Sequence, residues 1–303
     1  MPFICKLLFY TMIQYNPKVW FSLIFHSYSK HVMKTLWPVL MFMAALSFGI
    51  EVVYDYFELS QENFPGTLSM HSLLGIVLGL FLVFRINSAY DRWWEGRKMW
   101  GGMVNSTRNF ALKLNAYLSK EDHESREWFA KMIPNFIIAT KEHLRRGTQI
   151  SELDPPSDDF ANKLKEYKHK PNHLSAMLYT KVNDLYKKGD LTGYQLMNLD
   201  KELKDFTDLI GACERIKNTP IPYSYSMYIK KFLFIYIVTL PFAFINNFGY
   251  FTEIIVVLIT FILLSVELIS EEIEDPFGKD VNDLPTDELS DKIKDNVKEI
   301  LLA

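Results

Sequence analysis

Long apolar runs alternate with charged stretches along this chain of 303 residues. The strongly apolar runs cover residues 32–54, 68–84, 232–250 and 254–266. A helix that crosses a bilayer core of ~30 Å needs about 20 residues, so two runs are long enough and two need tilt or burial against neighbours. The pattern predicts four transmembrane helices. The alternative is a soluble protein with four buried helices, but uncharged runs of this length are rare in soluble cores.

Basic residues indicate how these helices are oriented. Lysines precede the first run, and the segment between the second and third runs is rich in Lys and Arg. The loop of residues 55–67 has no Lys or Arg and carries Asp55, Glu58 and Glu62. By the positive-inside rule, both termini and the long middle segment are expected in the cytoplasm. The expected location is the inner (plasma) membrane, crossed several times.

The middle segment has apolar residues at mixed spacings of three and four, which is typical of helices. Breaks are expected at Gly147, Pro155, Pro171 and Gly189. The predicted fold class is therefore all-α, with a large helical cytosolic region. The expected divisions are a cytosolic segment 1–31, transmembrane helices 1 and 2 in 32–90 with a pore-lining helix 68–90, the cytosolic region 91–229, transmembrane helices 3 and 4 in 230–270, and an acidic tail 271–303.

Composition agrees with a mixture of membrane and water-exposed parts. Hydrophobic residues make up 49% of the chain, and the mean hydropathy is +0.00. The net charge of −3 gives no reason to expect nucleic acid as a partner. Cys5 and Cys213 lie far apart in sequence, which argues against a disulfide framework or a thiolate zinc site.

The second apolar run has a distinctive spacing. Ile76, Leu80 and Phe84 recur every four residues, so they share one face over ~12 Å of helix. Gly75 and Gly79 beside them would let helices approach closely. The three side chains could face lipid or another helix. Alternatively, copies of this helix surround an axis and form an apolar constriction that gates by dewetting, which requires a symmetric homo-oligomer.

Several unusual motifs follow one another from this run to the tail. They are residues 75–85, 90–97, 213–216, 219–223, 273–278 and 282–285. Their composition and order resemble the bestrophin family in its bacterial form. The resemblance covers nearly the whole chain.

The resemblance implies a homopentameric channel in a lipid bilayer, with four transmembrane helices per subunit. The hydrophobic neck of that family falls on Ile76, Leu80 and Phe84, although Leu80 replaces an aromatic residue of the animal members. A second, cytosolic constriction is placed near Leu196 or Met197. The permeant ions would be monovalent, Na⁺, K⁺ or Cl⁻, and would pass down their gradients.

An apolar neck holds no charged ring that fixes the sign of the ion. Animal and plant bestrophins conduct anions, whereas studied bacterial relatives pass monovalent cations. Together with acidic entrance charges at Asp55, Glu58 and Glu62, this resemblance leads us to expect cations rather than anions. Those residues could instead be a solvated loop. A chloride channel of the same fold and a non-conducting membrane scaffold or receptor are the alternatives.

Acidic residues gather in the tail. By resemblance, Glu272, Asp275, Asp280 and Asp283 fall on the calcium clasp of the animal relatives, and Ca²⁺ prefers such oxygen ligands. The EF-hand spacing is absent, and Lys279 interrupts the acidic run. The alternative is an acidic helix stop that pairs with basic residues of the cytosolic region. No cofactor is required for conduction.

Motifs for catalysis are missing from the sequence, so an enzyme is not expected. His169 and His173 flank Pro171, and His143 lies on a helix without the HExxH spacing, so each histidine is interpreted as a surface residue. Arg85, at the inner end of the second run, needs a partner because an unpaired charge is costly there. We expect a structural ion pair with Asp91 or with a neighbouring subunit, rather than a direct role with the permeant ion.

Overall fold

The computed structural model describes residues 27–59, 66–145, 147–156 and 159–303. In these stretches the regular structure is helical, which confirms the all-α prediction. Most of the expected segment 1–31 lies outside the described residues, and so does Glu62. The helices form two compact units, and the long helix α3 (Thr67–Tyr117) contributes residues to both. The division expected at residue 90 falls within this helix.

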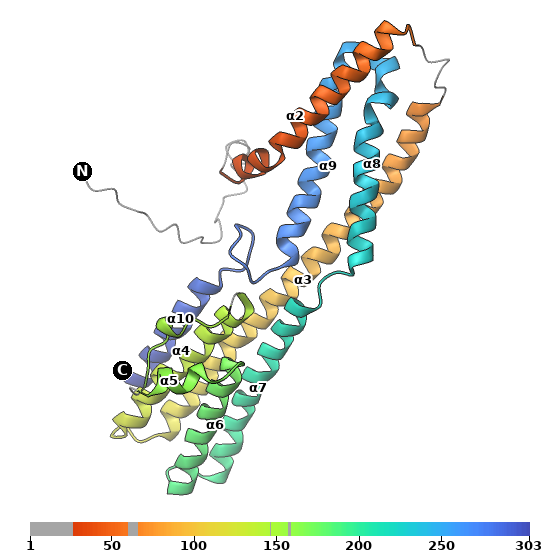
Figure 1. Cartoon of the computed structure of the whole chain (residues 1–303). Coiled ribbons are helices and arrows are strands. Elements are labelled where there is room, and N and C mark those ends of the chain that lie inside the picture. The colour runs from red at the N-terminus through yellow and green to blue at the C-terminus, as the bar shows by residue number, and fades with distance from the viewer. Residues whose placement is uncertain (1–26, 60–65, 146, 157–158) are drawn as a thin grey trace, which may run out of the picture. The chain divides into compact units, whose positions relative to one another are not determined.

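One unit, called the apolar unit here, contains the described residues of 13–92 together with 220–274. It consists of α2 (Ser27–Tyr56), the first part of α3, α8 (Tyr223–Phe248) and α9 (Thr252–Glu274). These segments run side by side, and α9 packs against both α2 and α8 (Figure 1). A short 3-10 turn, Gly249–Phe251, joins α8 to α9.

Apolar side chains hold this unit together. Leu78 and Leu82 of α3 share a buried cluster with Leu233 and Ile237 of α8 and Met43 of α2. By length and composition, three stretches of the described chain could cross a membrane, and they are His31–Tyr56, Thr67–Tyr117 and Tyr223–Glu274. The third stretch contains both α8 and α9.

The other unit, called the bundle unit here, contains the described residues of 93–219 and 275–303. Its helices are the second part of α3, then α4 (His123–Arg145), α5 (Phe160–Lys165), α6 (Lys170–Lys188), α7 (Gly193–Asn218) and α10 (Thr286–Leu302), with a 3-10 turn η2 (Ile150–Glu152). Helix α4 is buried along most of its length and packs against α6, α7 and α10 (Figure 1).

Aromatic rings fill the centre of the bundle unit. Phe136 of α4 stacks on Phe206 of α7 with ring centroids 5.3 Å apart, and Phe110 of α3 meets Phe206 edge to face. Pro171 lies in the first turn of α6, and Gly189 ends that helix with a φ of 88°. Both positions were predicted as breaks, and both fit the ordinary preferences for proline at helix starts and glycine at helix ends.

Ion pairs attach α10 to α4. The carboxylate of Asp287 accepts hydrogen bonds from Lys141 Nζ at 2.7 Å and from Arg145 Nη2 at 2.8 Å. Burial by itself would raise the pKa of Asp287, but the hydrogen bonds and charges of Arg145 and Lys141 outweigh it and hold this pKa below its ordinary value. The folded state therefore favours the ionised carboxylate, and Asp287 stabilises the fold wherever it is charged.

We expect Asp287→Asn to lower the thermal midpoint in detergent at pH 7 by about 2–4 °C, the equivalent of about 1 kcal/mol. The stabilisation is complete above the unfolded-state pKa of about 4 and is lost as the pH falls toward the lower folded-state pKa. The difference between variant and wild type should therefore shrink below about pH 4. Exposed Asp291 on the same helix provides the control, Asp291→Asn. Equal midpoints for the two variants at pH 7 would contradict the assignment.

Candidate functional site

The three predicted neck residues lie on a face of α3 that the described residues of its chain leave open. The exposed fractions of Ile76, Leu80 and Phe84 are 73%, 56% and 52%. The opposite face is buried, since Leu78 and Leu82 pack in the core of the apolar unit. Helix α3 therefore has a covered side and an uncovered side, and the predicted neck lies on the uncovered side.

This uncovered face is apolar throughout the depth of the predicted neck. Leu73, Val77 and Val83 are also exposed between or beside the three neck positions. Such a surface offers no ligand to an ion, but a ring of such surfaces around an axis would exclude water from a narrow gap. The face can therefore act as a barrier and cannot itself coordinate a permeant ion.

Exposure alone does not distinguish this face from surfaces that meet lipid. Large apolar side chains are also exposed on the other apolar helices, for example Phe42 of α2, Phe234 of α8 and Leu258 of α9. Leu258 has the same exposed fraction as Leu80, 56%. Both surfaces suit a hydrocarbon environment, so the interpretation depends on whether copies of the chain meet at α3.

The two glycines beside the neck have different surroundings. A Cβ atom added to Gly75 would lie 2.7 Å from the hydroxyl oxygen of Tyr236, so Gly75 permits close packing of α3 against α8. A Cβ atom added to Gly79 would meet nothing within 4 Å among the described residues. The packing role predicted for Gly75 has a partner within the chain, the Tyr236 hydroxyl, whereas Gly79 lies at a surface that the described residues leave open.

Arg85 follows the neck and lies on the covered side of α3. It is 1% exposed, and its Nη2 lies 2.7 Å from Oε2 of Glu274. Its Nε lies 3.7 Å from Oε2 of Glu267. The structural ion pair predicted for Arg85 is present, but its partners belong to α9. Asp91, the neighbour considered from the sequence, is exposed.

Glu274 connects several segments at this end of the apolar unit. Its Oε1 accepts a hydrogen bond from the backbone N–H of Ile221 at 3.0 Å, just before α8. Its backbone carbonyl accepts from Arg92 Nε of α3 at 3.1 Å. Sequence reasoning missed Glu274 as a partner of Arg85. Its spacing from Glu267, two helical turns along α9, is the signal that could have indicated a shared face.

The remaining predicted channel residues differ in their surroundings. Asp55 and Glu58, at the end of α2, are exposed, and Glu62 lies outside the described residues. Met197 on α7 is exposed, whereas Leu196 is partly buried against the core of the bundle unit. Of the two candidates for a second constriction, Met197 is therefore the one whose side chain is available to meet other molecules.

The acidic tail forms a tight turn with internal contacts. Asp275 pairs with Lys217 of α7. Oδ2 of Asp283 accepts a hydrogen bond from the backbone N–H of Asp280 at 2.6 Å. Glu272, on α9, lies 3.7 Å from His31. The Asp275–Lys217 pair corresponds to the predicted alternative, in which the acidic stretch pairs with basic residues.

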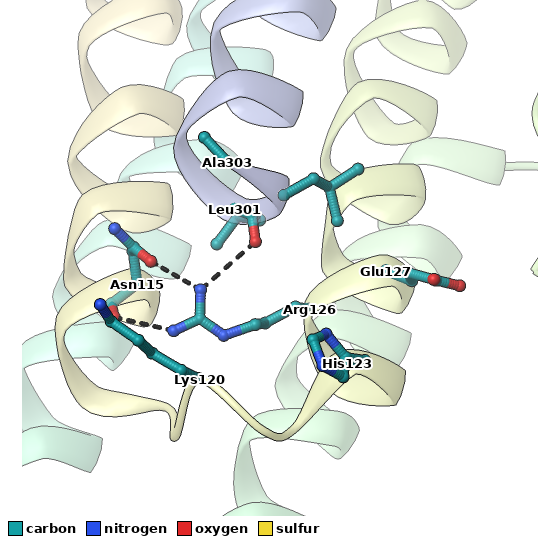
Figure 2. A pocket seen from close by; sticks show the side chains of 8 residues that line it. Asn115, Lys120, His123, Arg126, Glu127, Leu301 and Ala303 are labelled. Carbon is teal, nitrogen blue, oxygen red and sulfur yellow. Dashed lines mark hydrogen bonds between the residues drawn. The ribbon is translucent and has the colours of Figure 1, made fainter.

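A cavity of about 550 Å³ lies beside the end of α10, between α3 and α4 (Figure 2). Its lining includes Lys120, His123 and the buried Arg126. The Arg126 guanidinium donates to Asn115 Oδ1 at 2.6 Å, and it also donates to the carbonyls of Leu118 and Leu301. Because Arg126 donates to carbonyls at the C-terminal ends of both α3 and α10, its role is to cap these helices.

Comparison with known proteins agrees with this architecture. A family model described as Bacterial/Fungal Bestrophin protein matches residues 12–299. A voltage-dependent anion channel-forming protein of Nostoc is 40% identical over 229 residues, covering 74% of this chain and 75% of the relative. The protein of the same name from Synechocystis is 31% identical over 292 residues, covering 94% and 93%.

Solved structures of bacterial bestrophin homologs also resemble this chain. A bacterial bestrophin homolog from Klebsiella pneumoniae has a TM-score of 0.80 and 26% sequence identity, covering 86% of this chain and 97% of that chain. The match to the family model extends over nearly the whole sequence and includes both units. This chain therefore belongs to the bacterial and fungal bestrophin family.

Proposed function

We propose that this chain is one subunit of an ion channel in which several copies of α3 surround a common axis. The observation that carries the proposal is the uncovered apolar face of α3, with Ile76, Leu80 and Phe84 turned away from the chain's own core. One chain supplies one such face, so a closed neck requires several chains related by rotation. Family membership and the names of the Nostoc and Synechocystis relatives support conduction.

In the proposed assembly each subunit spans the membrane four times, through α2, the first part of α3, α8 and α9. Five subunits is the number that the bestrophin resemblance implies. The positive-inside pattern places both termini and the bundle unit in the cytoplasm of a cell bounded by an inner membrane. Lipid would cover the apolar surfaces of the other helices, and α3 would line the pore.

The proposed neck works by excluding water. Rows of Ile, Leu and Phe side chains around a narrow opening make hydration of the gap unfavourable, so the neck conducts only when it widens. Met197 of α7 is proposed as the second constriction because its side chain is exposed. Binding of Ca²⁺ by the acidic tail stays a prediction, and the ion would have to displace Lys217 from Asp275.

For the permeant ion, we propose monovalent anions. The relatives' names favour anions, in contrast to the cations expected from the sequence. Conduction of cations is the second candidate, favoured by the exposed carboxylates Asp55 and Glu58 at the end of α2. Several copies of these carboxylates around an entrance would raise the local cation concentration. An apolar neck is compatible with permeant ions of either charge.

Reversal potentials in planar bilayers separate these two candidates. Under asymmetric NaCl, an anion channel reverses near the chloride equilibrium potential and a cation channel near that of sodium. We expect the current to reverse near the chloride equilibrium potential. Asp55→Asn with Glu58→Gln should then increase anion conductance modestly, because like-charge repulsion at the entrance is removed. Reversal near the sodium potential, abolished by the same double substitution, would overturn the anion proposal.

The neck itself is tested by Leu80→Ala. Removing three carbons from each subunit widens and partly rehydrates the constriction, so we expect ion flux from liposomes to rise several-fold with assembly unchanged. The matched control is Leu258→Ala, which changes the same residue type at the same exposed fraction on α9. The control should conduct like the wild type. If the two variants behave alike, the uncovered face of α3 does not line the pore.

Arg85 is proposed to be structural rather than part of the ion pathway, because it is buried against α9. Glu274→Gln leaves this buried guanidinium without its near partner, which costs about 3 kcal/mol for such pairs. We expect a lower thermal midpoint in detergent and unchanged ion selectivity in the channels that remain. Glu271→Gln is the control, because Glu271 lies on α9 like Glu274 but pairs at an exposed position with Lys230 of α8. Altered selectivity with normal stability would indicate that Arg85 contacts the permeant ion.

A further inference from the structure

Three side chains that are distant in sequence meet in the bundle unit, outside the proposed pore. They are His143 in the last turn of α4, His169 at the start of α6 and Glu214 on α7. Nε2 of His143 lies 2.8 Å and Nε2 of His169 lies 2.6 Å from the same atom, Oε1 of Glu214. The imidazole rings are 4.5 Å apart between centroids, so both face one carboxylate oxygen.

This set of donors is suited to a transition metal. Two imidazole nitrogens and one carboxylate oxygen hold Zn²⁺ in sites that keep a fourth position open. Ca²⁺ and Mg²⁺ are disfavoured here, since they take oxygen ligands almost entirely. Among the described residues, this is the group of histidine, cysteine and carboxylate side chains close enough to share an ion, with its ligand atoms within 4.8 Å of one another.

The distances need only a small adjustment to accept an ion. Bonds of about 2.0 Å in a tetrahedral site place neighbouring ligand atoms about 3.3 Å apart. The separations of 2.8 and 2.6 Å between the histidine nitrogens and the Glu214 oxygen would have to increase by less than 1 Å, and the two histidine ligand atoms, which lie within 4.8 Å of each other, would have to reach the same spacing of about 3.3 Å. Side-chain rotation can supply changes of this size. The three side chains are 28%, 32% and 25% exposed, so an ion can enter from water, and a water molecule can fill the fourth position.

Metal binding at His169 would also affect the start of helix α6. Nδ1 of His169 accepts a hydrogen bond from the backbone N–H of Asn172 at 3.1 Å and so caps α6. A neutral imidazole has one N–H, and while Nδ1 accepts, that proton is on Nε2, facing Glu214. Ligation through Nε2 moves the proton to Nδ1, which then no longer accepts from Asn172. Metal binding would therefore exchange one cap hydrogen bond for a metal bond.

We propose that His143, His169 and Glu214 form a binding site for Zn²⁺ that links α4, the start of α6 and α7. The site lies within the bundle unit and uses none of the residues assigned to conduction, so it does not depend on the channel proposal. Two histidines and a glutamate on three helices would let one ion cross-link the core of the unit. Zinc binding should accordingly raise the thermal stability of the full-length protein.

The test is zinc titration of the full-length protein in detergent, purified through a tag that contains no histidine. Calorimetry should show about one Zn²⁺ per chain, and Co²⁺ should give the visible absorption of a tetrahedral site. Glu214→Gln, which keeps the side-chain shape, should weaken zinc binding at least about tenfold, since loss of even an outer partner of a metal site costs that much. His169→Asn should do the same while preserving a good helix cap.

His173→Gln is the matched control, because this histidine lies on α6 near His169 but stacks on Tyr167 instead of facing Glu214. It should bind zinc as the wild type does. The proposal is overturned if the wild type binds no zinc, or if Glu214→Gln and His169→Asn bind it as tightly as His173→Gln. Either result would leave the three side chains as a hydrogen-bonded cluster, whether or not the protein conducts ions.

Discussion

The rotation of α3 about its own axis determines which of its side chains face the core, and the buried charge of Arg85 fixes that rotation. Arg85 lies on the same side of the helix as Leu78 and Leu82. A guanidinium in apolar surroundings is tolerated only with a partner, and here the partners are Glu267 and Glu274 of α9. With Arg85 held toward α9, Leu80 and Ile76 lie five and nine residues earlier, rotated by about 140° and about 180° from it, so they point away from α9. The open apolar face is therefore a consequence of where one charge is neutralised.

Glu274 makes this arrangement specific. A single carboxylate that accepts from both Arg85 and the backbone of Ile221 must sit at one place, so a change of register by one turn would break several contacts together. Replacing such a network by apolar groups need not reduce stability, but removing one member leaves another unpaired. The network is better understood as selecting one helix register than as a large source of stability. Register matters here because the function proposed for α3 depends on which residues form its outer face.

The spacing of Ile76, Leu80 and Phe84 predicted a row on one helix face from helix geometry alone, and all three are exposed on α3, but their role as a neck stays a prediction. It did not identify the partner of Arg85, because Glu274 is distant in the chain and only tertiary packing brings it near. The nearby Asp91 was considered for that reason. The same limit hid the cluster of His143, His169 and Glu214. Sequence motifs detect metal ligands that are close together on one helix or loop. These three side chains are far apart in the sequence and come from three helices, so no motif contains them.

Gly79 suggests what covers the outer face. Glycine within a helix costs about 1 kcal/mol relative to alanine, so its presence calls for a compensating contact. For Gly75 that contact is visible, since the hydroxyl of Tyr236 occupies the space a Cβ atom would need. For Gly79 the described chain provides no such neighbour, and lipid would accept a methyl group as readily as a hydrogen atom. A second copy of the chain that approaches closely at the outer face would explain the glycine. It would also place Leu80 of each subunit beside the same axis.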